Sequence, residues 1–207
     1  MLYQINRKVD ENKTMKICVY GAASSKIDKQ FIEVGEELGR KMVERGHTLV
    51  FGGGKGGMMG AVARGIIEKK GQLLGIQPKF FEENNAEIAF AECTEFIHTE
   101  TMRERKKMLD EMSDAFIVTP GGIGTFDEFF EILTLKQLGR HPKAIVIFNV
   151  NGYYDHLLKM MEHSVEKHFI TEETADLYKV TTTIDETLDY LESYDPSSID
   201  LSKVKIN

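Results

Sequence analysis

A glycine-rich turn that leads into two acids is the first stretch of this chain where chemistry is expected. Residues 119–128, TPGGIGTFDE, follow the apolar run 115–118 and precede apolar residues at helical spacing that end at Gly139, a predicted helix C-cap. Such a turn brings bare backbone close to a ligand, and a helix N-terminus favours anions. Thr125 and Glu128 match a capping box, so Glu128 could cap the helix, act on a substrate, or do both.

A basic cluster opens another predicted helix. Residues 102–107, MRERKK, follow a predicted strand, as the glycine turn does. Standing alone, such a run is more often a solvated helix face with Glu–Lys pairs. Beside a glycine turn the arginines have a second use, because a planar guanidinium binds two phosphate oxygens at once.

Strands and helices alternate along most of the chain. Strands are predicted at 17–20, 47–51, 72–77, 95–98, 114–118, 143–148 and 177–182. Helices are predicted at 28–46, up to about 70, 101–113, up to 139, 153–169 and 184–192. This alternation predicts an α/β fold with a doubly wound parallel sheet and helices on both faces. We expect one domain over residues 15–193, between a polar N-terminal extension at 1–14 and a loose C-terminal tail at 194–207.

Three turns rich in small residues follow predicted strands. They are GAASS at 21–25, GGGKGGMMG at 52–60 and PGGIGT at 120–125. Ligands of parallel α/β sheets bind at the carboxyl ends of the strands, near the point where the strand order reverses. Three such turns on one edge therefore predict a nucleotide or sugar-phosphate site. Tight packing between strand and helix is the alternative reason for some of the glycines in 52–60.

Two widespread nucleotide motifs do not fit. Gly52, Gly54 and Gly57 match G-x-G-x-x-G, but they follow the second predicted strand, and the next strand ends at Gln77 without the acid of a dinucleotide site. Lys55 is followed by glycine, whereas a Walker P-loop requires serine or threonine there. We therefore expect neither NAD binding nor kinase or NTPase chemistry.

Composition narrows the classes of function. The 207 residues carry a net charge of −7, which argues against a general binder of nucleic acids or membranes. Cys18 and Cys93 are too few for a disulfide framework, so we expect reduced thiols in a cytoplasmic protein. We expect no signal peptide and no transmembrane segment. His163 and His168 are spaced poorly for a metal on one predicted helix, and no metal site is expected.

Four strings together match one family. GGGKGGMMG resembles the family's GGG-x-x-G-[LM]-M-G turn, MRERK at 102–106 its M-[HR]-x-R-K motif, and GYYDHLL at 152–158 its later segment. PGGIGTFDE at 120–128 fits PGG-x-GT-x-x-E at every fixed position. Over residues 15–182 the chain resembles the LOG (Lonely Guy) family of cytokinin riboside 5′-monophosphate phosphoribohydrolases, whose members are often labelled lysine decarboxylases.

The resemblance implies a homodimer of Rossmann-like subunits, with no cofactor expected. Such an enzyme cleaves the N-glycosidic bond of an adenosine 5′-monophosphate and releases the base and ribose 5-phosphate. The family's catalytic pair falls on Arg105 and Glu128. Its substrate side falls on Ala22, Ser24, Gly53, Gly54, Met102, Arg103, Lys106, Pro120, Gly121, Gly122, Ile123, Gly124 and Thr125.

The expected chemistry assigns separate tasks to the catalytic pair. Breaking a ribosyl C–N bond builds positive charge on the sugar, which a carboxylate stabilises. Glu128 would serve as this carboxylate or position water, and it must be ionised, which the helix N-terminus favours. Arg105 could hold Glu128, bind ribose or phosphate oxygens, or aid departure of the base.

Two departures from the family pattern leave the base open. The first turn reads GAAS where many members have CGSS, and Thr101 stands where an acid often precedes the basic motif. The base could be adenine, a prenylated adenine or another purine. One competing hypothesis is a non-catalytic carrier of a nucleotide or phosphorylated cofactor. A lysine decarboxylase is the other, but nothing in the sequence marks a lysine for pyridoxal phosphate.

Overall fold

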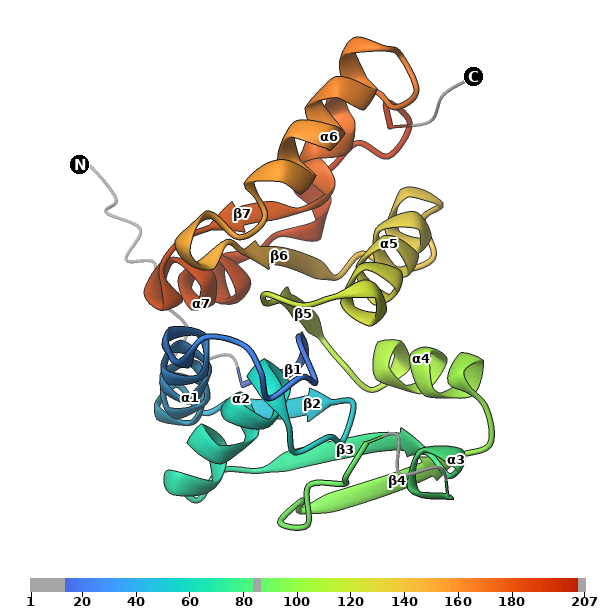
Figure 1. Cartoon of the computed structure of the whole chain (residues 1–207). Coiled ribbons are helices and arrows are strands. Elements are labelled where there is room, and N and C mark those ends of the chain that lie inside the picture. The colour runs from blue at the N-terminus through green and yellow to red at the C-terminus, as the bar shows by residue number, and fades with distance from the viewer. Residues whose placement is uncertain (1–13, 84–86, 205–207) are drawn as a thin grey trace, which may run out of the picture.

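The protein is an α/β domain built on one parallel sheet. The computed structural model describes residues 14–83 and 87–204, so the predicted extension lies outside it apart from Thr14. In this part of the chain seven strands pair in the order β4-β3-β2-β1-β5-β6-β7, and every pair is parallel (Figure 1). The strands are β1 Lys16–Tyr20, β2 Thr48–Phe51, β3 Leu73–Pro78, β4 Glu95–Thr99, β5 Ala115–Val118, β6 Ala144–Phe148 and β7 Lys179–Thr181. The predicted parallel sheet is confirmed.

Helices cover both faces of the sheet, as the alternating pattern predicts. The α-helices are α1 Lys29–Glu44, α2 Gly57–Glu68, α3 Phe80–Glu83, α4 Met102–Glu111, α5 Ile123–Gln137, α6 Asp155–Glu166 and α7 Ile184–Ser193. Short 3-10 turns are η1 Val150–Gly152, η2 Glu172–Leu177 and η3 Pro196–Ser198. Helices α1, α2 and α7 pack on one face, and α4, α5 and α6 on the other (Figure 1).

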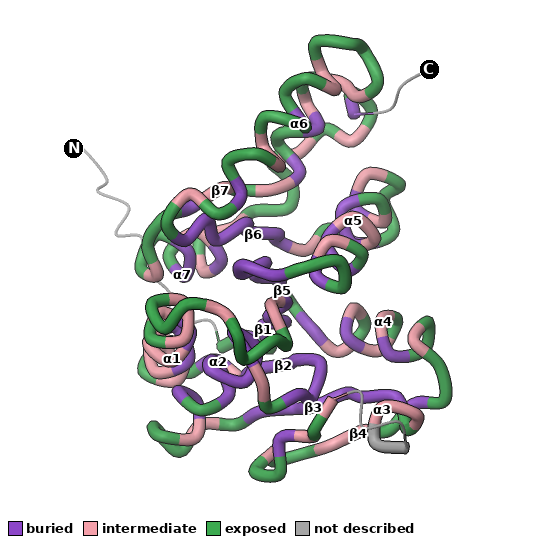
Figure 2. Tube along the Cα trace, viewed as in Figure 1, coloured by how far each residue is buried: buried purple, intermediate pink, exposed green. Residues whose placement is uncertain are grey.

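The core lies in two layers, one on each side of the sheet. Every residue of β3, β5 and β6 is buried, and the helices expose only their outer sides (Figure 2). Strands covered on both faces read as continuous apolar runs, which is why AFIV and AIVIF are strands without an alternating pattern. Within the described residues no helix is long and apolar enough to cross a membrane.

One prediction about the start of a helix is wrong. Helix α5 begins at Ile123 with Gly122 as its N-cap, so Thr125 lies inside the first turn and forms no capping box with Glu128. The tail was expected to be loose, but within its described part, 194–204, the Val204 side chain is fully buried. At the other end of α5, Gly139 has φ +69° just past the helix, consistent with its role in ending it.

The sheet brings the three small-residue turns together. Strands β2, β1 and β5 are neighbours, and the turns follow their carboxyl ends. The chain runs outward from β1 to β4 and then returns to pair β5 on the other side of β1. This reversal of strand order is where ligands bind in such sheets, so the turns line the expected crevice.

Candidate active site

The turn before α5 presents open backbone. A Cβ added at Gly122 or Gly124 would meet no protein atom within 4 Å, so packing does not require glycine at either position. Gly121 differs, because the side chain of Thr125 occupies the space beside it. The first amides of a helix have no partner within the helix, and they carry its partial positive charge. This end of α5 therefore combines exposed backbone with the partial positive charge of a helix N-terminus.

Three hydroxyl groups hold the turn in place. Tyr153 Oη donates to the carbonyl of Gly121 at 2.7 Å, and Tyr154 Oη donates to that of Thr119 at 2.7 Å. The Thr119 hydroxyl donates to the Tyr20 carbonyl at 2.8 Å. Sequence reasoning gave these tyrosines no role, although the segment GYYDHLL carried part of the resemblance. They act by fixing the strand end from which the turn starts.

Arg105 and Glu128 form a buried ion pair. Arg105 Nη1 donates to Glu128 Oε1 at 2.8 Å, with side chains only 7% and 9% exposed. Arg105 Nε donates to the carbonyl of Ile76 in β3 at 3.1 Å, so the guanidinium spans from the sheet to α5. Its Nη2 lies where a Cβ of Gly52 would be, and only glycine leaves that space. The predicted catalytic residues thus lie together, and the glycine turn after β2 leaves room for the guanidinium that joins them.

The ionisation of Glu128 depends on Arg105. Burial raises the pKa of the Glu128 carboxyl, and the charge of Arg105 together with its hydrogen bond acts in the opposite direction. Smaller contributions from Asp127 and Glu87 also raise this pKa. Removing one partner of a buried ion pair costs about 3–5 kcal/mol, because it leaves the other charge uncompensated.

The glycines of 52–60 hold other parts of the protein. Gly56 and Gly57 press against the backbone of Ala22 and Ala23, which accounts for these two by packing. The carboxyl of Glu87 fills the space beside Gly54, and Gly53, at φ +79°, touches Phe96 and Gln77. The sequence predicted Gly53 and Gly54 as substrate contacts. In the structure the space that a Cβ would take at either position is filled by side chains of the protein itself.

The basic helix α4 is capped and partly tied to α5. Thr101, noted as a departure from the family, is the N-cap and forms a capping box with Glu104. Lys106 Nζ lies 2.9 Å from Asp127 and also pairs with Glu131. Met102 is half-buried, whereas Arg103 is exposed. Of the basic motif, only Arg105 is buried at the centre of the site.

Comparison with known proteins decides the family. A family model described as possible lysine decarboxylase matches residues 59–191. Cytokinin riboside 5′-monophosphate phosphoribohydrolase LOG2 of Arabidopsis thaliana is 33% identical over 190 residues, which are 92% of this chain and 88% of that protein. Cytokinin riboside 5′-monophosphate phosphoribohydrolase LOG of Oryza sativa subsp. japonica is 34% identical over 87% of this chain and 74% of that protein. The chain belongs to the LOG family.

Solved structures share the fold of this LOG-family chain. The molybdenum cofactor carrier protein of Chlamydomonas reinhardtii matches with a TM-score of 0.65 and 18% identity, over 88% of this chain and all of that one. The molybdenum cofactor binding protein of Rippkaea orientalis matches with a TM-score of 0.63 and 18% identity, over 86% of this chain and 96% of that one. The Rossmann-like fold implied by the resemblance is confirmed.

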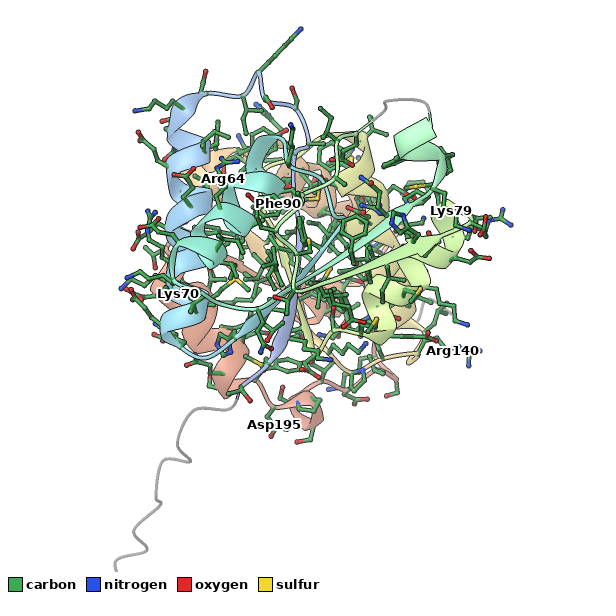
Figure 3. All side chains as sticks on the ribbon, turned by 90° about the horizontal axis from the view of Figure 1, so that it is seen from below. Arg64, Lys70, Lys79, Phe90, Arg140 and Asp195 are labelled. Carbon is green, nitrogen blue, oxygen red and sulfur yellow. The ribbon has the colours of Figure 1, made fainter. Side chains whose placement is uncertain are left out.

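Two cavities lie beside the PGGIGTFDE segment, residues 120–128. One, of about 250 Å³, is lined by the first and third small-residue turns together with apolar side chains: Ala22, Ser24, Ile27, Phe31, Pro120, Gly121, Gly122 and Tyr153. The other, of about 400 Å³, lies between α4 and α5, with Glu128 and Lys106 in its wall. Arg140 lies on its rim and points outward at the periphery (Figure 3). Among the described residues no cluster of His, Cys, Asp or Glu could hold a metal ion.

Proposed function

We propose that this LOG-family chain is a nucleoside 5′-monophosphate phosphoribohydrolase. It hydrolyses the N-glycosidic bond of an adenosine 5′-monophosphate and releases the base and ribose 5-phosphate. The names of the relatives support this reaction. The observation that carries it in the structure is the buried Arg105–Glu128 pair, one helical turn from open helix amides.

The open end of α5 binds the 5′-phosphate in this proposal. The amides of Gly122, Ile123 and Gly124 face the anion, and Gly121 and Thr125 shape the turn. Ala22, Ser24 and Pro120 line the cavity beside it. Gly53, Gly54, Met102, Arg103 and Lys106 stay candidate contacts on the ribose and base side. An unphosphorylated nucleoside lacks the anion, so it reacts poorly.

Glu128 stabilises the positive charge that develops on the ribose, or it activates water at C1′. Both tasks require the ionised carboxylate, and Arg105 favours that form. Arg105 is oriented by its hydrogen bond to the Ile76 carbonyl, so it also holds the carboxylate in one position. This pre-organisation in a buried site strengthens the electrostatic stabilisation of the transition state.

The working unit is proposed to be a cytoplasmic homodimer. Cys18 and Cys93 are free thiols, in keeping with a reducing compartment. Apolar side chains stand exposed at Ile123, Phe169 and Met160, at 84%, 76% and 50%. A second copy of the chain would cover such groups. Light scattering at micromolar concentration tests this proposal, and a monomeric mass would contradict it.

The direct test is release of base from AMP and from isopentenyl-AMP, followed by chromatography, with adenosine in parallel. Release from a monophosphate but not from adenosine supports the hydrolase and the phosphate site. The substrate with the higher kcat/KM identifies the base. Tight binding of intact nucleotide without release would instead support the carrier hypothesis.

A further inference from the structure

A second carboxylate lies beside the catalytic pair. The side chain of Glu87, between α3 and β4, occupies the space next to Gly54. Two residues earlier on the same turn, Gly52 leaves the space for the guanidinium of Arg105. The side chains of Arg105 and Glu87 thus both pack against one glycine turn. Both affect the pKa of Glu128: Arg105 lowers it and Glu87 raises it.

The segment that carries Glu87 is fastened to this turn. The amide of Lys55 donates to the carbonyl of Ile88 at 3.0 Å, and the amide of Phe90 donates to that of Gly53 at 2.7 Å. Phe90 is buried, and its ring centroid lies 6.1 Å from that of Phe51. The position of Glu87 is therefore set by backbone pairing on both sides of the glycines.

Several buried polar atoms at and near Glu87 have no hydrogen-bond partner among the described residues. Oε1 of Glu87 and both amide atoms of Gln77 are buried and make no hydrogen bond to the described residues. Gln77 is fully buried at the end of β3, against Gly53. Buried polar groups in native proteins nearly always have partners. A ligand with donors and acceptors on a flat edge, as a purine has, would supply them.

The order of groups along the sheet edge matches a nucleotide. The anion-binding turn follows β5, Glu128 lies one turn into α5, and Arg105 reaches across to β2 and β3. Glu87 and Gln77 lie beyond it, at the ends of β2 and β3. Neighbouring strands are about 4.8 Å apart, so β3 lies roughly 14 Å from β5. Phosphate at β5 and ribose at Glu128 leave the base beside Glu87 and Gln77.

We propose that Glu87 is the general acid of the reaction and donates a proton to a ring nitrogen of the departing base. This inference rests on the proposed hydrolase function. The bond between C1′ and the base nitrogen breaks, and its electron pair stays on the base, which takes the proton of Glu87. The oxygen of water bonds to C1′ and gives a proton to Glu128. Glu128 then releases that proton to solvent, and Glu87 regains one, so the enzyme is restored.

The environment of Glu87 suits an acid. Burial raises the pKa of its carboxyl, and the charge of Arg105 acts in the opposite direction without cancelling the rise. The groups that face it are therefore one cation, one neutral amide and the more distant carboxylate of Glu128. Base release should fall at low pH as Glu128 takes up a proton, and at high pH as Glu87 loses its own.

The test compares two leaving groups in wild type and Glu87→Gln. AMP needs a proton on its base, whereas 7-methyl-AMP carries a base that is already positively charged. We expect Glu87→Gln to lower kcat on AMP by about 10²- to 10⁴-fold, the range typical of general acid catalysis, and to leave release from 7-methyl-AMP nearly unchanged. The decline of the AMP rate at high pH should also disappear in the variant.

Controls separate the possible outcomes. Glu92→Gln removes an exposed acid of the same segment and should match wild type on both substrates. Glu128→Gln should lose both. An equal loss on AMP and 7-methyl-AMP in Glu87→Gln, or no loss on AMP, would overturn the role of Glu87 while the hydrolase stands. No base release by wild type from either substrate would overturn the hydrolase proposal itself.

Discussion

A buried lysine outside the candidate active site gives a quantitative prediction about stability. Lys136 on α5 is 1% exposed, and its Nζ has no hydrogen-bond partner among the described residues. Its Nζ lies over the ring of Tyr194, 4.8 Å from the ring centroid. Burial lowers the pKa of Lys136 from 10.5 to about 8. We predict that Lys136→Met stabilises the protein.

The size of the effect follows from the two pKa values. A difference of about 2.5 pKa units, at ~1.36 kcal/mol each, makes the buried charge cost about 3 kcal/mol at pH 7. The cation–π contact with Tyr194 offsets about 1 kcal/mol of that cost. Methionine fills a similar volume without a charge, so we expect a gain of about 2 kcal/mol. For a domain of this size that corresponds to a rise in Tm of roughly 4–8 °C.

The pH dependence has a definite sign. The folded pKa lies below the unfolded one, so between about pH 8 and 10.5 the unfolded chain binds more protons and the wild type gains stability as pH rises. Lys136→Met lacks this gain. Urea unfolding at pH 7 and pH 10 should therefore show the advantage of the variant shrinking. Lys159→Met, at an exposed position, is the control. A variant less stable than wild type at pH 7, or a constant difference, would refute the reasoning.

Further predictions concern two glycines and a thiol. Gly52→Ala should displace Arg105 and lower base release by about 10²-fold, the loss typical when a charge-stabilising group is removed; unchanged kcat would contradict its role. Gly122→Ala should leave Tm unchanged, because a Cβ there meets no protein atom, but raise KM for AMP by about 10- to 100-fold if the phosphate bond is lost. Burial raises the pKa of Cys18, so iodoacetamide should label it only after unfolding; rapid native labelling would contradict this.

The order of elements was predictable because the central strands are apolar on both faces. Short apolar runs such as AFIV and AIVIF predict buried strands. The segments between the strands carry apolar residues at helical spacing, which predicts helices. The pairing of Arg105 with Glu128 followed from the resemblance, since the two lie 23 positions apart and no spacing rule joins them. The structure supplies the reason, with α4 crossing beside β3 to meet α5.

Tertiary contacts decide the features that local sequence patterns could not predict. Thr125 and Glu128 have capping spacing, but Glu128 is held by Arg105 and Thr125 packs on Gly121, so the helix starts earlier with a bare glycine. The tail looked polar, yet Val204 finds a buried place and its carbonyl accepts from Gln137 Nε2 at 3.0 Å. Glu87 could not be predicted as a functional residue from the sequence, because only its position beside Gly54 distinguishes it from its acidic neighbours.

The central claim is that Glu128 performs chemistry, and one measurement tests it most directly. Base release from AMP and isopentenyl-AMP is followed by chromatography for wild type, Glu128→Gln and Asp127→Asn, the neighbouring acid with 55% exposure. Glutamine can still accept the hydrogen bond of Arg105 but leaves its charge uncompensated, so circular dichroism first establishes that the variant is folded. We predict release by wild type and Asp127→Asn, and its loss in folded Glu128→Gln. Equal release by wild type and Glu128→Gln would contradict the account.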